Sequence, residues 1–538
     1  MEKNIKNVVE PVSKKNLSAF VIPILIAAIT IGLYVLAFPP FKLPEFAYFF
    51  SVPFLIWVNR ANRFRGIIIS VIIAITFFSW FILLFWLRHV TWGGLIALSA
   101  LMAAFHIPWY LVAAKVFRNL HTTHYRLLKL CGLAGLWVSL EWTRGFIHTG
   151  LGFPWLTLGI TQWTRPIILQ IASLMGAYGV SFILIFFNLT LASYLIGLIH
   201  RIKKTPSINN TKYDLFAAIL SLVFVFLFFV KNLPQKNQEE FLFKAAIIQP
   251  NIPGTLKWDA NRFKENLSIL KTETLKFTNQ PIDVIIWPET ALPVPIKGDD
   301  GMQVWTESLV NQVNKLLWLG SLAQVNHLWY NSLLIVLPQS GLQDEFYSKR
   351  KRVLFGEYVP LRNWFPFVNK FIPVDWDIAA GQGSHLLDVR IHDLSLKMGG
   401  LVCFEDIFPE LSRASVRDGA DFFLVVTNNA WYGEEWCAYQ HAAHSILRAV
   451  ETRRPFIRCG NAGWSGWIDE WGVIRQVTEQ NNTIYFRGTD TFEVFRNKQW
   501  IHYLSPYVRY GDWFVYICFG LVLLSFIMHK KNEIKGSV

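Results

Sequence analysis

The sequence predicts two joined parts, a polytopic α-helical membrane domain and an α/β domain of soluble composition. Of the 538 residues, 53% are hydrophobic and only 16% are charged, whereas soluble proteins carry about 25% charged residues. Residues 1–231 hold 20 basic and 5 acidic residues, and the rest of the chain holds 31 basic and 32 acidic residues. Because the positive excess lies in the apolar half, it favours helices oriented in a bilayer over a nucleic-acid partner.

Eight apolar runs are candidate membrane spans, each of which needs about 20 residues to cross the hydrocarbon core. The second and the fifth run are short or interrupted. The first run follows basic residues, but it is too long for a signal-peptide core and no small-residue cleavage site comes after it, so we expect an uncleaved anchor. The runs lie near residues 17–38, 45–58, 66–87, 93–114, 127–142, 178–199, 213–230 and 511–528.

The distribution of Lys and Arg predicts which side of the membrane each loop faces. The set of alternate loops that includes the N-terminus holds 18 of these residues, and the opposite short loops hold only four. Basic residues accumulate in cytoplasmic loops. We therefore expect both termini in the cytoplasm, with a seven-helix domain over 1–231, an extracytoplasmic domain over 232–508, and a final span with a cytoplasmic tail over 509–538.

In the long polar interval, short runs rich in Val and Ile alternate with stretches of helical character. Continuous apolar strands between helices predict a sheet covered by helices. In such sheets, ligands gather at the carboxyl ends of the strands. The predicted strands are Lys244–Gln249, Asp283–Trp287, Asn331–Leu337, Leu396–Phe404 and Asp421–Thr427, and the predicted helices include Arg262–Phe277 and Gln440–Arg453.

Three polar residues stand at or near the ends of predicted strands. Each has an ordinary structural explanation: Glu289 can favour the positive end of a helix, the basic run around Lys349 can face water or lipid head groups, and Cys403 can be a small buried hydrophobe. Together they supply a carboxylate base, an ammonium that stabilises negative charge, and a thiol nucleophile. We also expect the Lys349 ammonium to favour the Cys403 thiolate.

These residues and their flanking motifs resemble those of a known family. Trp-Pro-Glu at Glu289, Tyr-x-Lys at Lys349 and a Gly-Gly strand before Cys403 resemble the Glu-Lys-Cys set of the nitrilase (carbon–nitrogen hydrolase) superfamily. With the spans before and after this domain, the whole chain resembles the apolipoprotein N-acyltransferases. Further matching segments are Gln249–Pro253, Lys257–Asp259, Trp287–Pro293, Phe355–Pro360, Thr427–Gly433, Arg458–Gly466 and Gly152–Trp155.

The resemblance implies an αββα sandwich in the extracytoplasmic domain and an acyl transfer through a thioester. Cys403 would attack a phospholipid ester, Glu289 would act as general base, and Lys349 would stabilise the tetrahedral intermediate. Lys349 is preferred to Lys351 because it follows Tyr347 by two residues and precedes Glu357 by eight, as in the family. The acyl chain would pass to the N-terminal α-amine of a diacylglyceryl-cysteine.

Further site residues and the setting of the reaction also follow from the resemblance. It implies that Glu357 and Glu405 support the active site and that Trp258 and Phe404 contact the substrate. Phe404 departs from the family, which often has Tyr there, so the ring is kept and the hydroxyl is lost. The implied enzyme is a monomer without cofactor or metal in a bacterial inner membrane, with a periplasmic catalytic domain, and its partners are the bilayer, a phospholipid donor and a diacylated lipoprotein acceptor.

Other interpretations remain open from the sequence. The same three residues suit a membrane-anchored amidase that uses water as the second nucleophile, and a transporter or receptor with a large external domain is the non-enzymatic alternative. His441 and His444, three residues apart, lack a visible third metal ligand, which favours satisfied histidines over a metal site. Cys437 and Cys459 can pair only if the fold brings them together.

Overall fold

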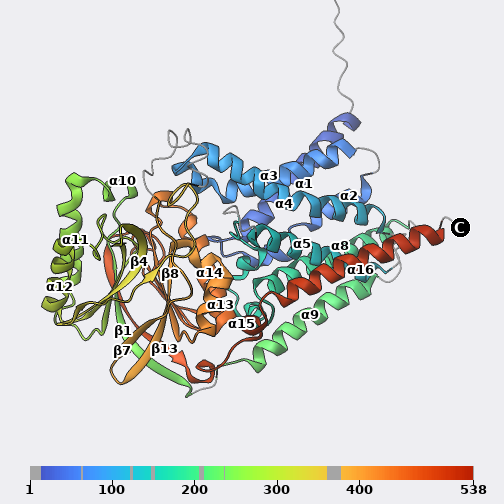
Figure 1. Ribbon diagram of the computed structural model, residues 1–538. Helices are drawn as coiled ribbons and strands as arrows, with labels where there is room; N and C mark the ends of the chain where they lie inside the picture. The colour runs from blue at the N-terminus through green and yellow to red at the C-terminus, as the bar shows by residue number, and fades with distance from the viewer. Residues whose placement is uncertain are drawn as a thin grey trace, which may run out of the picture.

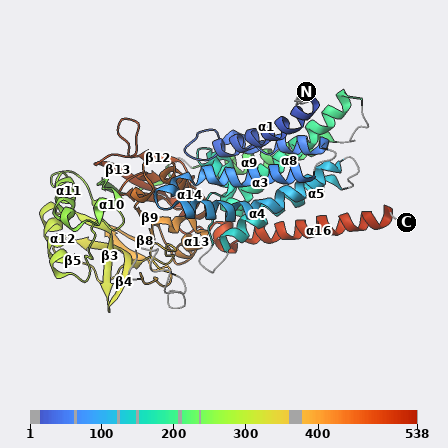
Figure 2. The same ribbon diagram turned by 90° about the horizontal axis from the view of Figure 1, so that it is seen from above.

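The computed structural model describes residues 14–61, 65–120, 125–146, 152–204, 211–234, 237–359 and 377–536. A helical part and an α/β part lie end to end, and the long helices run away from the α/β part (Figures 1 and 2). The basic residues before Lys14, Arg63, and Pro360 of the Phe355–Pro360 motif lie outside the described residues.

The helical part is built from apolar helices whose outer faces carry large hydrophobic side chains. Ile24 is 67% exposed, Leu220 57% and Leu523 59%, and a surface of this kind fits lipid rather than water. Among the described residues, four helical stretches are long and apolar enough to cross a membrane: Gly66–Leu83, Trp92–Arg118, Ala177–Ile202 and Thr211–Lys231. The helices are α1 (Lys14–Ala37), α2 (Val52–Arg60), α3 (Arg65–Leu83), α4 (Trp92–Arg118), α5 (Arg126–Phe146), α6 (Pro166–Leu169), α7 (Ala172–Met175), α8 (Ala177–Ile202), α9 (Thr211–Lys231) and α16 (Trp513–Gly536).

The two spans that the sequence predicts least clearly have different outcomes. The run 45–58 is not one helix, because a short 3₁₀ turn at Pro44–Tyr48 precedes the nine-residue α2. Nine residues of α-helix rise only about 14 Å, which is well short of the hydrocarbon thickness. The run 127–142 does form a single helix, α5, whose ends carry Arg126 and Arg144.

In the part of the chain that the structure describes, the first sheet of the α/β part has seven strands in the order β13-β1-β2-β3-β4-β5, with β6 also paired to β4. Strands β1, β2 and β3 run parallel, so their carboxyl ends meet at one edge. The strands are β1 (Glu239–Gln249), β2 (Val284–Trp287), β3 (Leu316–Val325), β4 (Leu328–Leu337), β5 (Gly341–Leu342), β6 (Tyr347–Ser348) and β13 (Gly488–Asn497).

The second sheet, over its described residues, has six strands in the order β12-β11-β10-β9-β8-β7, and β8, β9 and β10 run parallel. Buried apolar residues of the two sheets face each other, among them Phe243, Trp318 and Phe422. The strands are β7 (Leu387–Ile391), β8 (Leu394–Val402), β9 (Phe422–Thr427), β10 (Phe456–Gly460), β11 (Gly466–Ile468) and β12 (Ile474–Val477). The predicted α/β domain is therefore a pair of stacked sheets rather than one.

Helices cover the outer face of each sheet, which gives an αββα order (Figure 1). Helices α11 (Phe263–Leu275) and α12 (Asp300–Val313) cover the first sheet, where they share an apolar core with β1, β2 and β3. Helices α13 (Pro409–Arg417) and α14 (Cys437–Thr452) cover the second sheet on the side of the helical part. The small helices α10 (Gly254–Lys257) and α15 (Pro506–Tyr510) lie in connecting segments.

Helix α14 joins the two parts through buried polar contacts. Its Gln440 side chain accepts hydrogen bonds from the indole nitrogens of Trp86, at 3.0 Å, and Trp155, at 3.1 Å, and donates to the carbonyl of Leu83. Glu451 accepts a 2.8 Å hydrogen bond from the first N–H of α8, at Ala177. One apolar core runs continuously from the membrane-type helices into α13 and α14, so the second sheet is anchored to the helical part.

Candidate active site

Cys403 lies at a sharp turn directly after β8. Strand β8 ends at Val402, and Cys403 has a φ of +56° at the start of a 3₁₀ turn over Cys403–Ile407. A residue with a Cβ in this left-handed region is uncommon and costs about 1–3 kcal/mol, so surrounding contacts must hold it there. The hydroxyl of Thr427, at the end of the neighbouring β9, lies 3.8 Å from the Cys403 sulfur.

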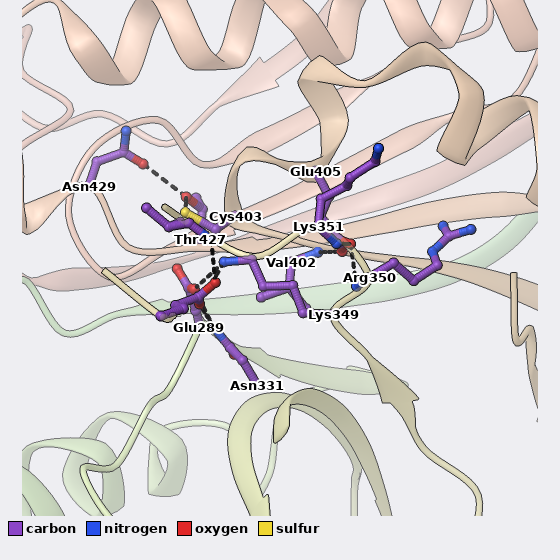
Figure 3. A network of polar contacts seen from close by, with 12 residues as sticks. Glu289, Asn331, Lys349, Arg350, Lys351, Val402, Cys403, Glu405, Thr427 and Asn429 are labelled. Carbon is purple, nitrogen blue, oxygen red and sulfur yellow. Dashed lines mark hydrogen bonds and ion pairs between the residues drawn. The ribbon is translucent and has the colours of Figure 1, made fainter. Parts of the chain in front are cut away.

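A buried cluster of charged groups stands beside the thiol. The Lys349 ammonium is 2.8 Å from Glu357 Oε1 and 3.6 Å from Glu289 Oε1. The side-chain amide of Asn331 donates to both carboxylates, at 2.8 Å to Glu289 and 2.9 Å to Glu357. Figure 3 shows the Lys349 ammonium between the Glu289 carboxylate and the Cys403 sulfur. The structure therefore brings together the base, the cation and the thiol that the sequence selects.

The electrostatic balance in this cluster sets the pKa of the Cys403 thiol. Desolvation, together with the negative charge of Glu289, outweighs the Lys349 ammonium and raises the pKa of the Cys403 thiol to about 12. Burial lowers the pKa of Lys349, but the carboxylates of Glu357 and Glu289 outweigh burial and raise it overall. The Lys349 ammonium lowers the pKa of the thiol, as the sequence predicts, but desolvation and the Glu289 charge have the larger effect. A protonated thiol needs a base at the moment of attack.

Glu405 is fully buried and ties the nucleophile turn to the Lys349 segment. Its carboxylate accepts a 2.7 Å hydrogen bond from the Tyr347 hydroxyl. It also accepts from the backbone N–H groups of Val402 at 2.8 Å, Arg350 at 2.7 Å and Lys351 at 3.0 Å (Figure 3). Four donors on one carboxylate leave little of its acceptor capacity free for a substrate. This arrangement fixes the distance between β8 and β6.

The two residues predicted to contact substrate occupy different positions. The Phe404 ring packs edge-on against Phe408, and the Lys349 ammonium is 5.3 Å from its centroid. Trp258, at the end of α10, is 42% exposed. The preceding Lys257 points inward instead, and its ammonium donates a 3.0 Å hydrogen bond to the Glu289 carbonyl. Phe404 therefore belongs to the cluster. Trp258 lies on the surface, next to Lys257, which contacts Glu289 of the cluster.

Sequence reasoning missed Asn331, Lys257 and Asp406 as partners of the site. Asn331 begins a predicted strand, but nothing in that pattern shows that its amide would bridge two acids. His441, considered earlier as a metal ligand, is buried against Asp406 and the Cys403 carbonyl. Within the described ranges, no group of three His, Cys, Asp or Glu side chains is placed to hold a metal ion. Cys437 and Cys459 are free thiols.

The fold and the site define a carbon–nitrogen hydrolase domain attached to a helical domain of membrane type. Residues 244–487 match the family model for carbon–nitrogen hydrolases, and residues 32–190 match the model for the apolipoprotein N-acyltransferase N-terminal domain. The apolipoprotein N-acyltransferase of Geobacter metallireducens is 30% identical over 527 residues, which cover 95% of this chain and 96% of the relative. The chain belongs to the apolipoprotein N-acyltransferase family, which confirms the resemblance seen in its motifs.

Other known proteins match parts of the chain. The apolipoprotein N-acyltransferase of Rickettsia typhi is 33% identical over 361 residues, which cover 66% of this chain and 68% of the relative. Among solved structures, a carbon–nitrogen hydrolase superfamily protein from Xanthomonas campestris aligns with a TM-score of 0.34 and 18% identity. That alignment covers 47% of this chain and 90% of the other chain.

Proposed function

We propose that this protein transfers a fatty acyl chain from a membrane phospholipid to the N-terminal α-amine of a diacylglyceryl-cysteine in a lipoprotein. The observation that carries the proposal is the cluster of the buried Glu289 and Lys349 with the partly exposed Cys403, in a domain that is anchored to membrane-type helices. In the first step Cys403 attacks the ester carbonyl while Glu289 takes the thiol proton. Lys349 stabilises the oxyanion, and Glu289 returns the proton to the departing lysophospholipid oxygen, leaving an acyl-thioester.

The second step consumes the thioester with an amine. The neutral α-amine of the acceptor attacks the thioester carbonyl, Glu289 takes a proton from the attacking nitrogen, and the Cys403 sulfur leaves and is reprotonated. The products are an amide on the acceptor and the free enzyme. The bilayer and the anchored domain hold both lipid substrates near the sulfur, which supplies proximity. We assign substrate contacts to the Phe404 ring, beside the Lys349 ammonium, and to the exposed indole of Trp258.

The proposed setting is a bacterial inner membrane, crossed eight times by a monomer with its catalytic domain in the periplasm. The second crossing, near 45–58, is then made by the 3₁₀ turn and the short α2 together rather than by one helix. The parts are 1–231 with seven spans, 232–508 as the catalytic domain, and 509–538 as the last span and tail. The loop charges support this arrangement, as does the position of the start of α1 and the end of α16, which lie away from the α/β part (Figure 2). Both termini are then cytoplasmic.

Intact-protein mass spectrometry after incubation with phospholipid alone tests the chemistry. We expect one fatty-acyl addition on the wild-type protein, no addition on Cys403→Ser, and loss of the addition when a diacylated lipopeptide with a free α-amine is supplied. The lipopeptide should gain the acyl chain. Release of free fatty acid in place of acylated lipopeptide identifies a hydrolase, and acylation of the lipopeptide by Cys403→Ala would refute the assigned nucleophile.

Thiol labelling tests the proposed topology. Asp344 on the α/β part and Lys203 at the far end of α8 are both exposed. In a background without the native cysteines, a membrane-impermeant maleimide should label Asp344→Cys in spheroplasts. It should label Lys203→Cys only after the membrane is opened. The reverse pattern contradicts the proposed orientation.

A further inference from the structure

His441 of α14 contacts the backbone of the nucleophile turn. Its Nε2 lies 3.1 Å from the Cys403 carbonyl oxygen and 2.9 Å from Asp406 Oδ1. A carbonyl oxygen and an ionised carboxylate are both acceptors only. Nε2 must therefore carry a proton, and His441 donates to both oxygens. This histidine is buried, with 2% of its surface exposed.

The surroundings fix the imidazole in this orientation. The buried Asp406 carboxylate also accepts a 2.6 Å hydrogen bond from the Ser445 hydroxyl and one from the Arg458 guanidinium. Burial raises the pKa of Asp406, but His441 and Arg458 outweigh burial and lower it well below its ordinary value. The indole ring of Trp155 from the helical part also contacts His441, with centroids 5.7 Å apart. The imidazole is therefore held by contacts with an anion and with an aromatic ring.

Fixing the Cys403 carbonyl also fixes the next N–H group. A peptide unit is planar and trans, so the Cys403 C=O and the Phe404 N–H share one plane and point in opposite directions. With the carbonyl directed at His441, the Phe404 N–H is directed away from it. A hydrogen bond accepted by a carbonyl also polarises its peptide unit and strengthens the N–H as a donor. Both effects depend on the His441 proton.

We propose that His441 is a positioning residue for acyl transfer, which holds the Cys403–Phe404 peptide so that the Phe404 N–H and the Lys349 ammonium together stabilise the oxyanion. The inference rests on the proposed function, because it concerns the tetrahedral intermediate of that reaction. Backbone N–H groups stabilise such oxyanions best when they are oriented before the reaction begins. His441 itself stays on the far side of the peptide from the acyl group.

Two reactions of the same sulfur atom separate this role from a structural one. Thioester formation from phospholipid passes through an oxyanion, whereas alkylation by iodoacetamide displaces iodide at a saturated carbon and forms none. Both rates are measured at Cys403 by peptide mass spectrometry on the full-length protein. For His441→Leu, which removes the donor, we expect thioester formation to fall about 10²-fold and alkylation to stay within about twofold. For His441→Gln, whose amide can donate in place of Nε2, we expect most of the thioester rate to return.

His444→Gln is the matched control. His444 lies one turn further along α14 and packs on the Trp155 ring, with centroids 5.3 Å apart, and its Nε2 is 3.5 Å from the N–H of Leu156. These contacts are with the helical part, so both rates should stay unchanged. If His444→Gln reproduces the loss seen in His441→Leu, general packing of α14 explains the effect and the proposal is overturned.

The remaining outcomes are also decisive. If thioester formation and alkylation fall equally in His441→Leu, the substitution has changed the thiol or the fold rather than the stabilisation of the oxyanion. If the rate of thioester formation is unchanged, His441 has no positioning role. Either result overturns the proposal. If His441→Leu does not accumulate in membranes, Asp406→Asn replaces it, because losing that charge weakens the hold on the imidazole and should also slow acylation selectively. A wild-type protein that is alkylated normally but forms no thioester contradicts the proposed function itself.

Discussion

Helices α12 and α14 cover the two sheets of the same domain, but their surroundings differ. In α12, 4 of 14 residues are buried, along one face against the first sheet. In α14, 15 of 16 residues are buried, because the second sheet lies on one side and the helical part on the other. A helix buried all round cannot be a surface element of a free domain. The second sheet is therefore built to be held by the helical part.

This difference divides the candidate site into two halves. We call the half that is fixed to the helical part the braced half, and the other the free half. The braced second sheet supplies Cys403, while the first sheet and its loops supply Glu289, Asn331 and Lys349. The sulfur is thus held relative to the membrane-type helices, and the charged groups approach it from the side that faces away from them. The comparison predicts that substitutions of Glu289 and Lys349 on the first sheet affect mainly the chemistry, whereas those on the braced sheet also affect the stability of the whole protein.

The largest effect is expected for Lys349→Met on the first sheet. Lys349 is the cation between Glu289 and Glu357, and its loss leaves two carboxylates facing the thiol and no ammonium for the oxyanion. We expect thioester formation to fall about 10³-fold, as when an oxyanion donor is removed. Lys351→Met is the matched control, since Lys351 is 35% exposed and pairs with Glu410 at 3.3 Å. Equal loss in both variants would show that the basic segment, rather than the buried ammonium, matters.

The two acids Glu289 and Glu405 offer a direct test of the division. Glu289→Gln should stop thioester formation and leave the melting temperature nearly unchanged, because the amide oxygen still accepts from Asn331. Glu405→Gln should lower stability by about 2–4 kcal/mol, since an amide cannot accept hydrogen bonds from all four donors that now meet the carboxylate. Thermal unfolding in detergent and thioester mass spectrometry measure the two effects. The same pattern in both variants would argue against separate roles.

The strands that the sequence predicts most clearly are the buried parallel strands. The predicted Asp421–Thr427 strand is β9 over Phe422–Thr427, and Asp283–Trp287 is β2 over Val284–Trp287. Buried parallel strands appear as continuous apolar runs, so their position is visible in the local pattern. The same pattern does not show which of two sheets a strand joins, and the sequence therefore predicted a single covered sheet before the family resemblance implied two.

Residues of the site could be predicted from the sequence only where they lie in a recognisable motif. The positions of Glu289, Lys349 and Cys403 follow from segments next to strand ends. Asn331 and His441 could not be found in this way, because their contacts join residues 42 and 38 positions apart. The net direction of the Cys403 pKa shift depends on burial, which only the packed structure defines, whereas the lowering effect of Lys349 follows from its charge.

A third prediction concerns Lys257, which lies beneath the Glu289 loop. Burial lowers the pKa of this ammonium from 10.5 to about 8, although Glu289 opposes the shift. Between these values the unfolded chain binds more protons than the folded protein, so stability should rise with pH from about 8 to 10.5. The difference between wild type and Lys257→Met should change by up to about 3 kcal/mol over that window. Melting temperatures across the window measure it, with the exposed Lys264→Met as the control that should follow the wild type. If the stability of Lys257→Met depends on pH in the same way as that of the wild type, the pH dependence does not come from Lys257.

The smallest effect is expected at the partly exposed contact between the helical part and the loop before α14. Glu435 pairs with Arg88 and with His89 Nε2 at 2.7 Å, and all three side chains are at least 25% exposed. Desolvation raises the pKa of Glu435, but these two partners outweigh it and lower the pKa overall. Glu435→Gln should cost less than about 1 kcal/mol, and the cost should shrink further in high salt.

The buried counterpart of this contact is Gln440, five residues further along. Gln440→Leu leaves the indole N–H groups of Trp86 and Trp155 and the carbonyl of Leu83 without their partner, in a region closed to water. Unsatisfied buried polar groups cost about 1–3 kcal/mol each, so this variant should melt well below Glu435→Gln at every salt concentration. If the two variants lose the same stability, the helical part is held to the second sheet by its periphery rather than through α14, and the braced half of the site loses its physical basis.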